Sequence, residues 1–199
     1  MSPLGREPAC VRGQQQGAGK MPNITFQMEK QKTVNWCWAA VAVSVNRHFA
    51  PDSHWRQCGI VEVVLSRAKG TDKLPLPVHA CCTKPIPRRC NQAWYLEDAL
   101  KQVGRLKGWP KAVHLSFKKI QRGIDAQRPV CVRIQWCEPG NPGHFVVISG
   151  YHITRARVRQ VDVEDPATGS RSTVHYRSLV SNYRRLGRWT HTYLVEGRR

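Results

Sequence analysis

The spacing of apolar residues changes along the chain. Over the first two-thirds they recur every three to four residues, which predicts helices at residues 36–49, 58–69, 96–103 and 117–126. Over the last third they alternate with polar residues or form short continuous runs, which predicts strands at 129–136, 144–151, 155–164, 172–176 and 189–195. Helices followed by an antiparallel sheet are typical of the α+β class, with a helical lobe over about residues 30–126 and a β lobe over about 127–196.

The first 22 residues differ from the rest of the chain. They are rich in glycine, proline and glutamine, so we interpret 1–22 as a flexible leader or linker and 23–199 as one folded domain. They contain no apolar run of the kind that a Sec signal peptide needs. Apolar residues alternate over 23–28, which is a weak strand signal. No segment approaches the ~20 apolar residues that span a bilayer, so we expect no membrane span.

The first predicted helix carries a candidate nucleophile. This helix is apolar on nearly every face, which predicts burial, and Asn35 stands where it can cap a helix that begins at Trp36. Cys37 then lies in the first turn, where the partial positive charge of the helix N-terminus stabilises a thiolate. The alternative is a buried core cysteine, which is the commoner role of a free cysteine.

Three polar residues at structural boundaries can supply what a thiol nucleophile needs. Gln31 precedes the helix, where its amide can donate a hydrogen bond to an oxyanion beside the backbone N–H of Cys37. His144 begins an apolar strand after a Gly/Pro loop, where it can accept the thiol proton and later protonate a leaving amine. Asp165 ends the next strand, where it can fix the tautomer of the imidazole. This order of residues predicts an acyl-transfer site.

These assignments have rivals. Asp165 precedes a proline and is an ordinary turn residue in that setting, and Gln31 can be a solvated loop residue. Asp162 and Glu164 are alternatives to Asp165, but Glu164 should point to the opposite face of the strand and Asp162 lies further from the strand end. His191 is an alternative base, although it lacks the loop-edge setting of a base that lines a cleft.

The same residues resemble the active site of papain-like cysteine peptidases. A glutamine, five residues, and then a cysteine followed by tryptophan is similar to their active-site segment. The strings Asn-Trp-Cys-Trp-Ala-Ala at 35–40 and His-Phe-Val-Val-Ile-Ser-Gly-Tyr at 144–151 resemble the bacterial branch that includes the AvrRpt2-like effector proteases and related C39-like peptidases. The similarity extends over about residues 25–196.

The resemblance implies a two-lobed papain-like fold, with the nucleophile helix packed on an antiparallel sheet, and no cofactor. By this resemblance, the catalytic residues are Cys37, His144 and Asp165, and Gln31 lies in the oxyanion hole. Asp165 departs from the plant papains, which have asparagine there, but either side chain can accept a hydrogen bond from the imidazole N–H.

Four further cysteines surround an irregular, proline-rich region; they are Cys58, Cys81, Cys82 and Cys90. Zinc is one interpretation, since His79 is nearby, but the spacing lacks the paired Cys-x2-Cys units of structural zinc sites, and we predict no metal. Two disulfides are the other interpretation. The two adjacent cysteines would then bond different partners and stabilise a loop with little packing of its own.

The chain is strongly basic, with 32 Lys and Arg residues against 13 Asp and Glu, and a formal net charge of +19. The cations are scattered, no nucleic-acid-binding motif accompanies them, and most aromatic residues lie in apolar segments. We therefore expect no specific nucleic-acid partner. Long-range attraction instead favours an acidic protein substrate, or an acidic inhibitor, immunity protein or host target.

The sequence thus predicts a cysteine endopeptidase that hydrolyses peptide bonds through a thiol acyl-enzyme. A deamidase or transglutaminase would share this acyl-transfer chemistry and is an alternative. A basic binding module that keeps the fold without activity is another. The missing Sec signal and the resemblance to effector proteases favour a bacterial effector or toxin, secreted by a specialised system or delivered into another cell.

Overall fold

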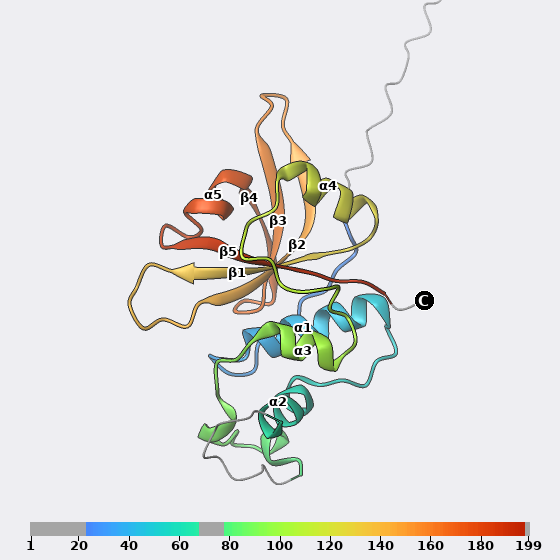
Figure 1. The fold of residues 1–199 in the computed structure, drawn as a ribbon, viewed down its shortest axis with the longest axis vertical. Helices are drawn as coiled ribbons and strands as arrows, with labels where there is room; N and C mark the ends of the chain where they lie inside the picture. Colours follow the sequence, from blue (N-terminus) through green and yellow to red (C-terminus); the bar gives the residue numbers. More distant parts are fainter. Residues whose placement is uncertain (1–22, 68–77, 198–199) are drawn as a thin grey trace, which may run out of the picture.

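The computed structural model describes residues 23–67 and 78–197, so the predicted leader at 1–22 lies outside the described residues. The chain forms a helical lobe and a sheet lobe (Figure 1). The helical lobe consists of α1 (Cys37–Phe49), α2 (Gln57–Ser66), α3 (Leu96–Gln102) and the 3-10 turns η1 (Ala80–Cys82) and η2 (Arg88–Cys90). The sheet lobe contains β1 (Val130–Trp136), β2 (His144–Ile153), β3 (Arg159–Asp165), β4 (Ser170–His175) and β5 (Gly187–Leu194), with α4 (Phe117–Asp125) and α5 (Tyr176–Ser181).

The five strands form one antiparallel sheet in the order β4-β3-β2-β1-β5. Strands β1 to β4 are joined to their sequence neighbours, while β5 returns to pair with β1 at the other edge. The structure confirms the predicted α+β class and the antiparallel sheet.

Helix α1 connects the two lobes. All ten residues from Cys37 to Asn46 are buried, as the apolar pattern predicts for a helix covered on every side. It contacts α2 and α3 of the helical lobe and β2 of the sheet (Figure 1). Residues at its first turn therefore lie at the boundary between the lobes.

The limits of several predicted elements were wrong. Residues 23–28 form no strand; Asn23 makes an isolated bridge with Gly150, and the next residue donates its backbone N–H to the sheet at 2.7 Å. Strand β3 begins at Arg159, because Thr154 and Val158 close a turn with a 3.0 Å hydrogen bond. Helix α5 was not predicted, since only six residues carry it and it follows a strand directly.

The cap predicted for α1 was also wrong. Trp36, not Asn35, is the N-cap residue. The Asn35 amide donates instead to the carbonyl of Asn91 at 3.0 Å, because a long-range partner engages the group that would have capped the helix.

None of the helices within residues 23–67 and 78–197 combines the length and the apolar character needed to cross a bilayer.

Candidate active site

Cys37 is the first residue of α1. The Trp36 side chain makes no capping hydrogen bond, and the first turn contains no acidic residue. The first N–H groups of a helix have no partner within the helix, so their partial positive charge acts on the Cys37 side chain. Only 7% of Cys37 is exposed. The helix start thus places a partial positive charge and little solvent at the Cys37 sulfur.

Two tryptophans on either side of Cys37 fix the start of the helix. The indole N–H of Trp36 donates to the Cys90 carbonyl at 2.7 Å, and that of Trp38 donates to the Gln92 carbonyl at 3.0 Å. Both indoles are fully buried, so these bonds satisfy polar groups that would otherwise be costly to bury. Cys37 is thus anchored to the loop formed by the end of η2 and the residues after it.

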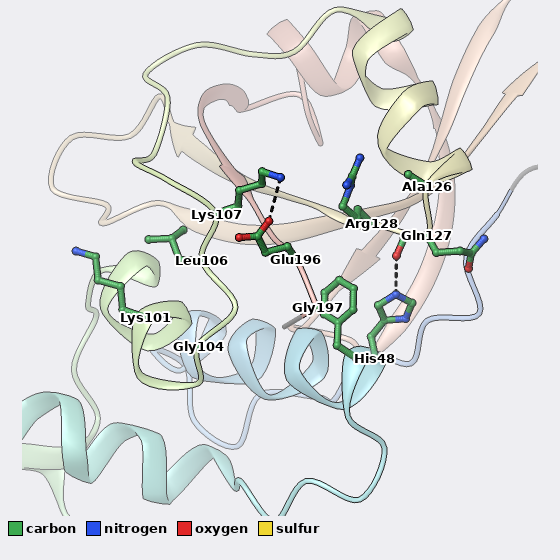
Figure 2. Close-up of a pocket in the computed structure, with 11 residues that line it drawn as sticks. His48, Lys101, Gly104, Leu106, Lys107, Ala126, Gln127, Arg128, Glu196 and Gly197 are labelled. Carbon is green, nitrogen blue, oxygen red and sulfur yellow. Dashed lines mark hydrogen bonds and ion pairs between the residues drawn. The ribbon is translucent and has the colours of Figure 1, made fainter. Parts of the chain in front are cut away.

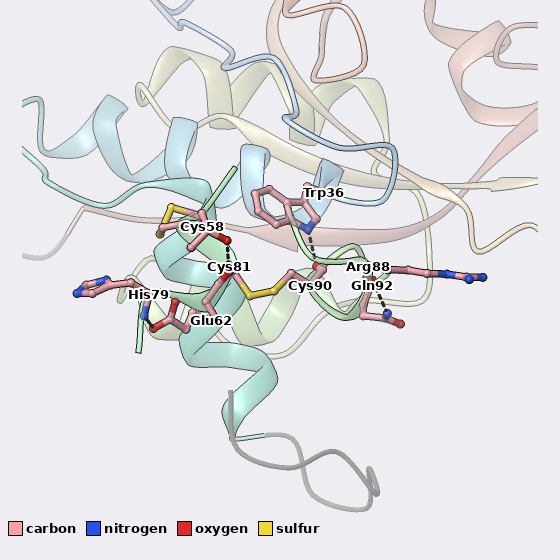
Figure 3. The surroundings of a disulfide bond; sticks show 11 residues. Trp36, Cys58, Glu62, His79, Cys81, Arg88, Cys90 and Gln92 are labelled. Atoms are coloured by element: carbon pink, nitrogen blue, oxygen red, sulfur yellow. Dashed lines mark hydrogen bonds between the residues drawn. A yellow bond between two sulfur atoms is a disulfide. The ribbon is translucent and has the colours of Figure 1, made fainter. Parts of the chain in front are cut away.

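That loop is itself held by disulfide bonds. Cys81 is bonded to Cys90, and the adjacent Cys82 is bonded to Cys58 in α2. Figure 3 shows the first of these bonds with the Trp36 indole reaching the Cys90 carbonyl. The two bonds connect α2, η1 and η2, where short 3-10 turns contribute little packing.

One group near these disulfides has the residue types of a metal site. Ligand atoms of Glu62, His79 and Cys82 all lie within 4.8 Å of one another. Cys82 is in a disulfide and therefore offers no thiolate, and the Glu62 carboxylate already accepts the backbone N–H of His79 at 2.6 Å. The oxidised protein does not present a complete zinc ligand set here.

His144 and Asp165 meet on one face of the sheet. Val147 of β2 lies opposite Glu164 of β3, so Asp165 is level with the residue before Val147 and shares a face with His144. The His144 Nε2 and an Asp165 carboxylate oxygen are 2.7 Å apart. The Cys37 side chain lies close enough to the imidazole to raise its pKa. Because Nε2 faces Asp165, Nδ1 is the ring nitrogen left for the thiol.

The environment of His144 favours the imidazolium. Burial of the ring lowers its pKa, but the hydrogen bond to Asp165 and the proximity of Cys37 outweigh the effect of burial and raise the pKa to about 9. The ring is therefore protonated at neutral pH. The structure brings Cys37, His144 and Asp165 together, with the imidazole bonded to the carboxylate and beside the thiol.

Asp165 has further partners that the sequence did not reveal. One carboxylate oxygen accepts the Ala167 N–H at 2.9 Å, and the other accepts the Tyr183 hydroxyl at 3.1 Å and lies 2.7 Å from an Arg184 guanidinium nitrogen. Burial raises the pKa of Asp165, but His144, the Ala167 N–H and Arg184 together hold it below its usual value. Asp165 is therefore a carboxylate at neutral pH.

Trp136 is another residue that sequence reasoning missed. Its ring stacks on the His144 imidazole at a centroid distance of 6.1 Å and on the Tyr183 ring at 6.3 Å. Since Tyr183 binds Asp165, the three rings and the carboxylate hold one another in place. The alternating pattern of the sequence places Trp136 in β1, but its contacts with the two rings are seen only in the folded structure.

The rival residues have other partners. Glu164 accepts the Ser149 hydroxyl at 2.7 Å and an Arg171 N–H at 2.6 Å, on the face opposite Asp165. Asp162 binds the His152 ring at 2.8 Å. His191 lies 3.0 Å from the Thr190 hydroxyl, and burial together with the charge of Arg133 lowers its pKa.

Gln31 lies beside the site, but its amide has another role in this structure. Its backbone N–H donates to the Pro166 carbonyl at 2.8 Å, which ties the segment before α1 to the turn after Asp165. Its side-chain nitrogen donates to the carbonyls of Thr33 and Val34 at 2.9 and 2.7 Å, across the turn that precedes α1. Both amide hydrogens are engaged, so an oxyanion contact requires the amide to release one carbonyl.

The structure is consistent with a papain-like peptidase. It has a two-lobed α+β fold, a cysteine at the start of a buried helix, and a His–Asp pair on neighbouring strands. The model of the Peptidase_C39 like family matches residues 23–193, and the chain belongs to this peptidase family. No curated protein matches the chain.

Proposed function

We propose that this protein is a cysteine endopeptidase that hydrolyses peptide bonds in protein substrates. The observation that carries the proposal is the His144 imidazole, which is hydrogen-bonded to Asp165 at 2.7 Å and lies close enough to Cys37 for this side chain to raise its pKa. A buried cysteine at a helix start, a histidine held in its protonated form and a carboxylate behind it are the parts that a thiol nucleophile requires.

The reaction follows from these contacts. The thiolate of Cys37 attacks the scissile carbonyl, and the backbone N–H of Cys37 stabilises the oxyanion, joined by the Gln31 amide when it leaves its loop carbonyls. The His144 imidazolium then gives its proton to the leaving amine. Water, deprotonated by the neutral imidazole, attacks the thioester; the C–S bond breaks, the acid product departs, and Cys37 and His144 are left as thiolate and imidazolium. Asp165 keeps the imidazole oriented through both steps.

The test compares the wild-type protein with a Cys37→Ala variant and a Cys137→Ala control, which removes an exposed free cysteine. Labelling of new N-termini in treated protein extracts should reveal cleavage by the wild type and the control, and none by Cys37→Ala. Cleavage by Cys37→Ala would refute the assignment. Intact substrates that gain about one mass unit would indicate a deamidase instead, because side-chain amide hydrolysis uses the same acyl-enzyme.

Alkylation separates an enzyme from an inactive binding module. At mildly acidic pH an ion-paired Cys37 should react with iodoacetamide faster than the exposed free Cys137, which serves as the internal reference for an unactivated thiol. Mass mapping that finds Cys37 unmodified would favour the module.

We further propose that the protein acts as a secreted bacterial effector or toxin. The disulfides Cys58–Cys82 and Cys81–Cys90 support action in an oxidising compartment rather than in a reducing cytosol. The resemblance to AvrRpt2-like effector proteases supports secretion by a specialised system. Peptide mapping without reductant, on protein recovered from the producing cells and from their medium, tests this: an extracellular, disulfide-bonded form is expected, and a reduced intracellular form would contradict it.

A further inference from the structure

A large hollow lies between the lobes at the end of α1 far from Cys37. It has a volume of about 1110 Å³ and is lined by the last turn of α1, the end of α3 and the segments around Lys107, Arg128 and Glu196 (Figure 2). The 13-residue helix α1 separates it from the thiol by about 18 Å along the axis. It is therefore a site distinct from the catalytic residues.

A smaller hollow of about 220 Å³ adjoins it, sharing Lys107 and Arg128 with it. Its floor is apolar, made by Leu115, Pro129, Val130, Leu194 and Val195. Cations surround both hollows, and we call the joined site the basic groove. Its cations are Lys101, Lys107, Lys111, Lys119, Arg122 and Arg128.

The groove is held in shape by backbone hydrogen bonds. Lys111 and Thr192 exchange N–H···O bonds of 2.9 and 2.8 Å, and the Lys107 N–H donates to the Leu194 carbonyl at 2.8 Å, so this loop pairs with the outer edge of β5. On the other side, α4 is anchored by buried Ile120 and Ile124. The groove is thus largely formed before any ligand binds, which lowers the entropic cost of binding.

Most cations of the groove have no counter-charge. Among the described residues that line it, Glu196 is the one carboxylate, and it binds Lys107 at 2.9 Å (Figure 2). Lys101 lies over the Trp109 ring at 4.7 Å. The side chains of the other four cations make no ion pair within the described part of the chain. Their repulsion leaves a strong positive potential that an anionic ligand would relieve.

The geometry points to an acidic segment of a partner protein as the occupant. We propose that the basic groove binds such a segment, with one apolar side chain in the smaller hollow and carboxylates on the surrounding lysines and arginines. The smaller hollow lies below the ~300–1,000 Å³ of drug-sized ligand pockets, which suits a single side chain. Its aliphatic floor fits no phosphate, and its lining has no aromatic ring on which a nucleobase could stack.

Binding is measured by fluorescence polarisation with a labelled nine-residue peptide that carries one central leucine flanked by aspartates and glutamates. The Cys37→Ala protein is used, so that binding is read without cleavage and independently of the proposed activity. The test variant is K119E/R122E. The control is R155E/R177E, which changes the net charge equally but alters exposed residues outside the groove.

We expect K119E/R122E to weaken binding at least about tenfold, because two attractions become repulsions. We expect R155E/R177E to change it less than about threefold, since distant exposed charges are screened by salt. Replacing the peptide leucine by serine should cost about tenfold, because the apolar contact is lost. Equal losses in both variants, or no effect of the leucine, would overturn the proposal. Tighter binding of a single-stranded oligothymidine of matched charge would also overturn it, in favour of a nucleic-acid ligand.

Discussion

The pH range of the proposed activity should depend on the charge of Asp165. An Asp165→Asn substitution isolates this charge, because an asparagine carbonyl can still accept the 2.7 Å hydrogen bond from His144 and the 2.9 Å bond from the Ala167 N–H. The asparagine NH2 group takes the place of the second oxygen and can donate to the Tyr183 hydroxyl. Arg184 is half exposed and can turn to solvent. The fold should therefore be retained.

The size and sign of the effect follow from His144. Its pKa is about 9, because Asp165 and Cys37 raise it by more than burial lowers it. Removing an opposite charge at this range lowers a histidine pKa by about 1–3 units. The variant imidazole should thus lose its proton near pH 6–8. Because the protonated ring is the acid for the leaving amine, activity should disappear on the alkaline side at a correspondingly lower pH.

The assay is the pH dependence of kcat/KM on a peptide substrate cut by the wild type. A two-unit shift would reduce the protonated fraction roughly 25-fold at about pH 8.5 and hardly change it at about pH 5.5. The alkaline limb should therefore move while the rate at lower pH falls much less. An alkaline limb at the same pH in both proteins would show that the carboxylate charge does not control His144.

Three other predictions concern the surroundings of the site. Replacing both Cys81 and Cys90 by alanine should lower the free energy of unfolding by about 3 kcal/mol, because a short loop loses its cross-link. Urea denaturation without reductant measures this, and unchanged stability would argue against the bond. Gly143→Ala should cost about 1–3 kcal/mol in the same measurement and impair the adjacent histidine, since φ is +90° and the new Cβ would lie 2.6 Å from a β1 carbonyl. Arg184→Gln should raise the pKa of Asp165, because a positive charge next to its carboxylate is lost. The acid limb of kcat/KM should move to higher pH by less than about one unit, since the guanidinium is half exposed to solvent; a larger shift would contradict this weak interaction between Arg184 and Asp165.

The sequence predicted the three candidate reacting groups, which the structure brings close together, because each stands at the boundary of an element with a clear period. Cys37 opens a uniformly apolar helix, and His144 opens an apolar strand. Alternation along β3 also separated Asp165 from Glu164, whose side chains lie on opposite faces. Where local pattern alone decided the placement, the sequence was sufficient.

The hydrogen bonds that hold these groups in place could not be predicted from the sequence. Trp36 bonds to the carbonyl of Cys90, 54 residues away, and Tyr183 reaches Asp165 from a turn between α5 and β5. Such contacts depend on how distant segments pack, which periodicity does not encode. The same reason explains why Asn35 is no cap: Asn91 approaches from far along the chain and engages it.

A carboxylate at position 165 needs support that an amide would not. Asp165 is 1% exposed, and burying a charge is costly unless partners replace its hydration. His144, the Tyr183 hydroxyl and Arg184 supply these partners, and the half-exposed guanidinium brings its charge to the buried oxygen while keeping contact with water. The carboxylate in turn stabilises the imidazolium more strongly than a neutral amide can. Aspartate in place of the asparagine of plant papains therefore extends the proposed thiolate–imidazolium pair to higher pH, while its hydrogen bond and the stacked rings orient the imidazole.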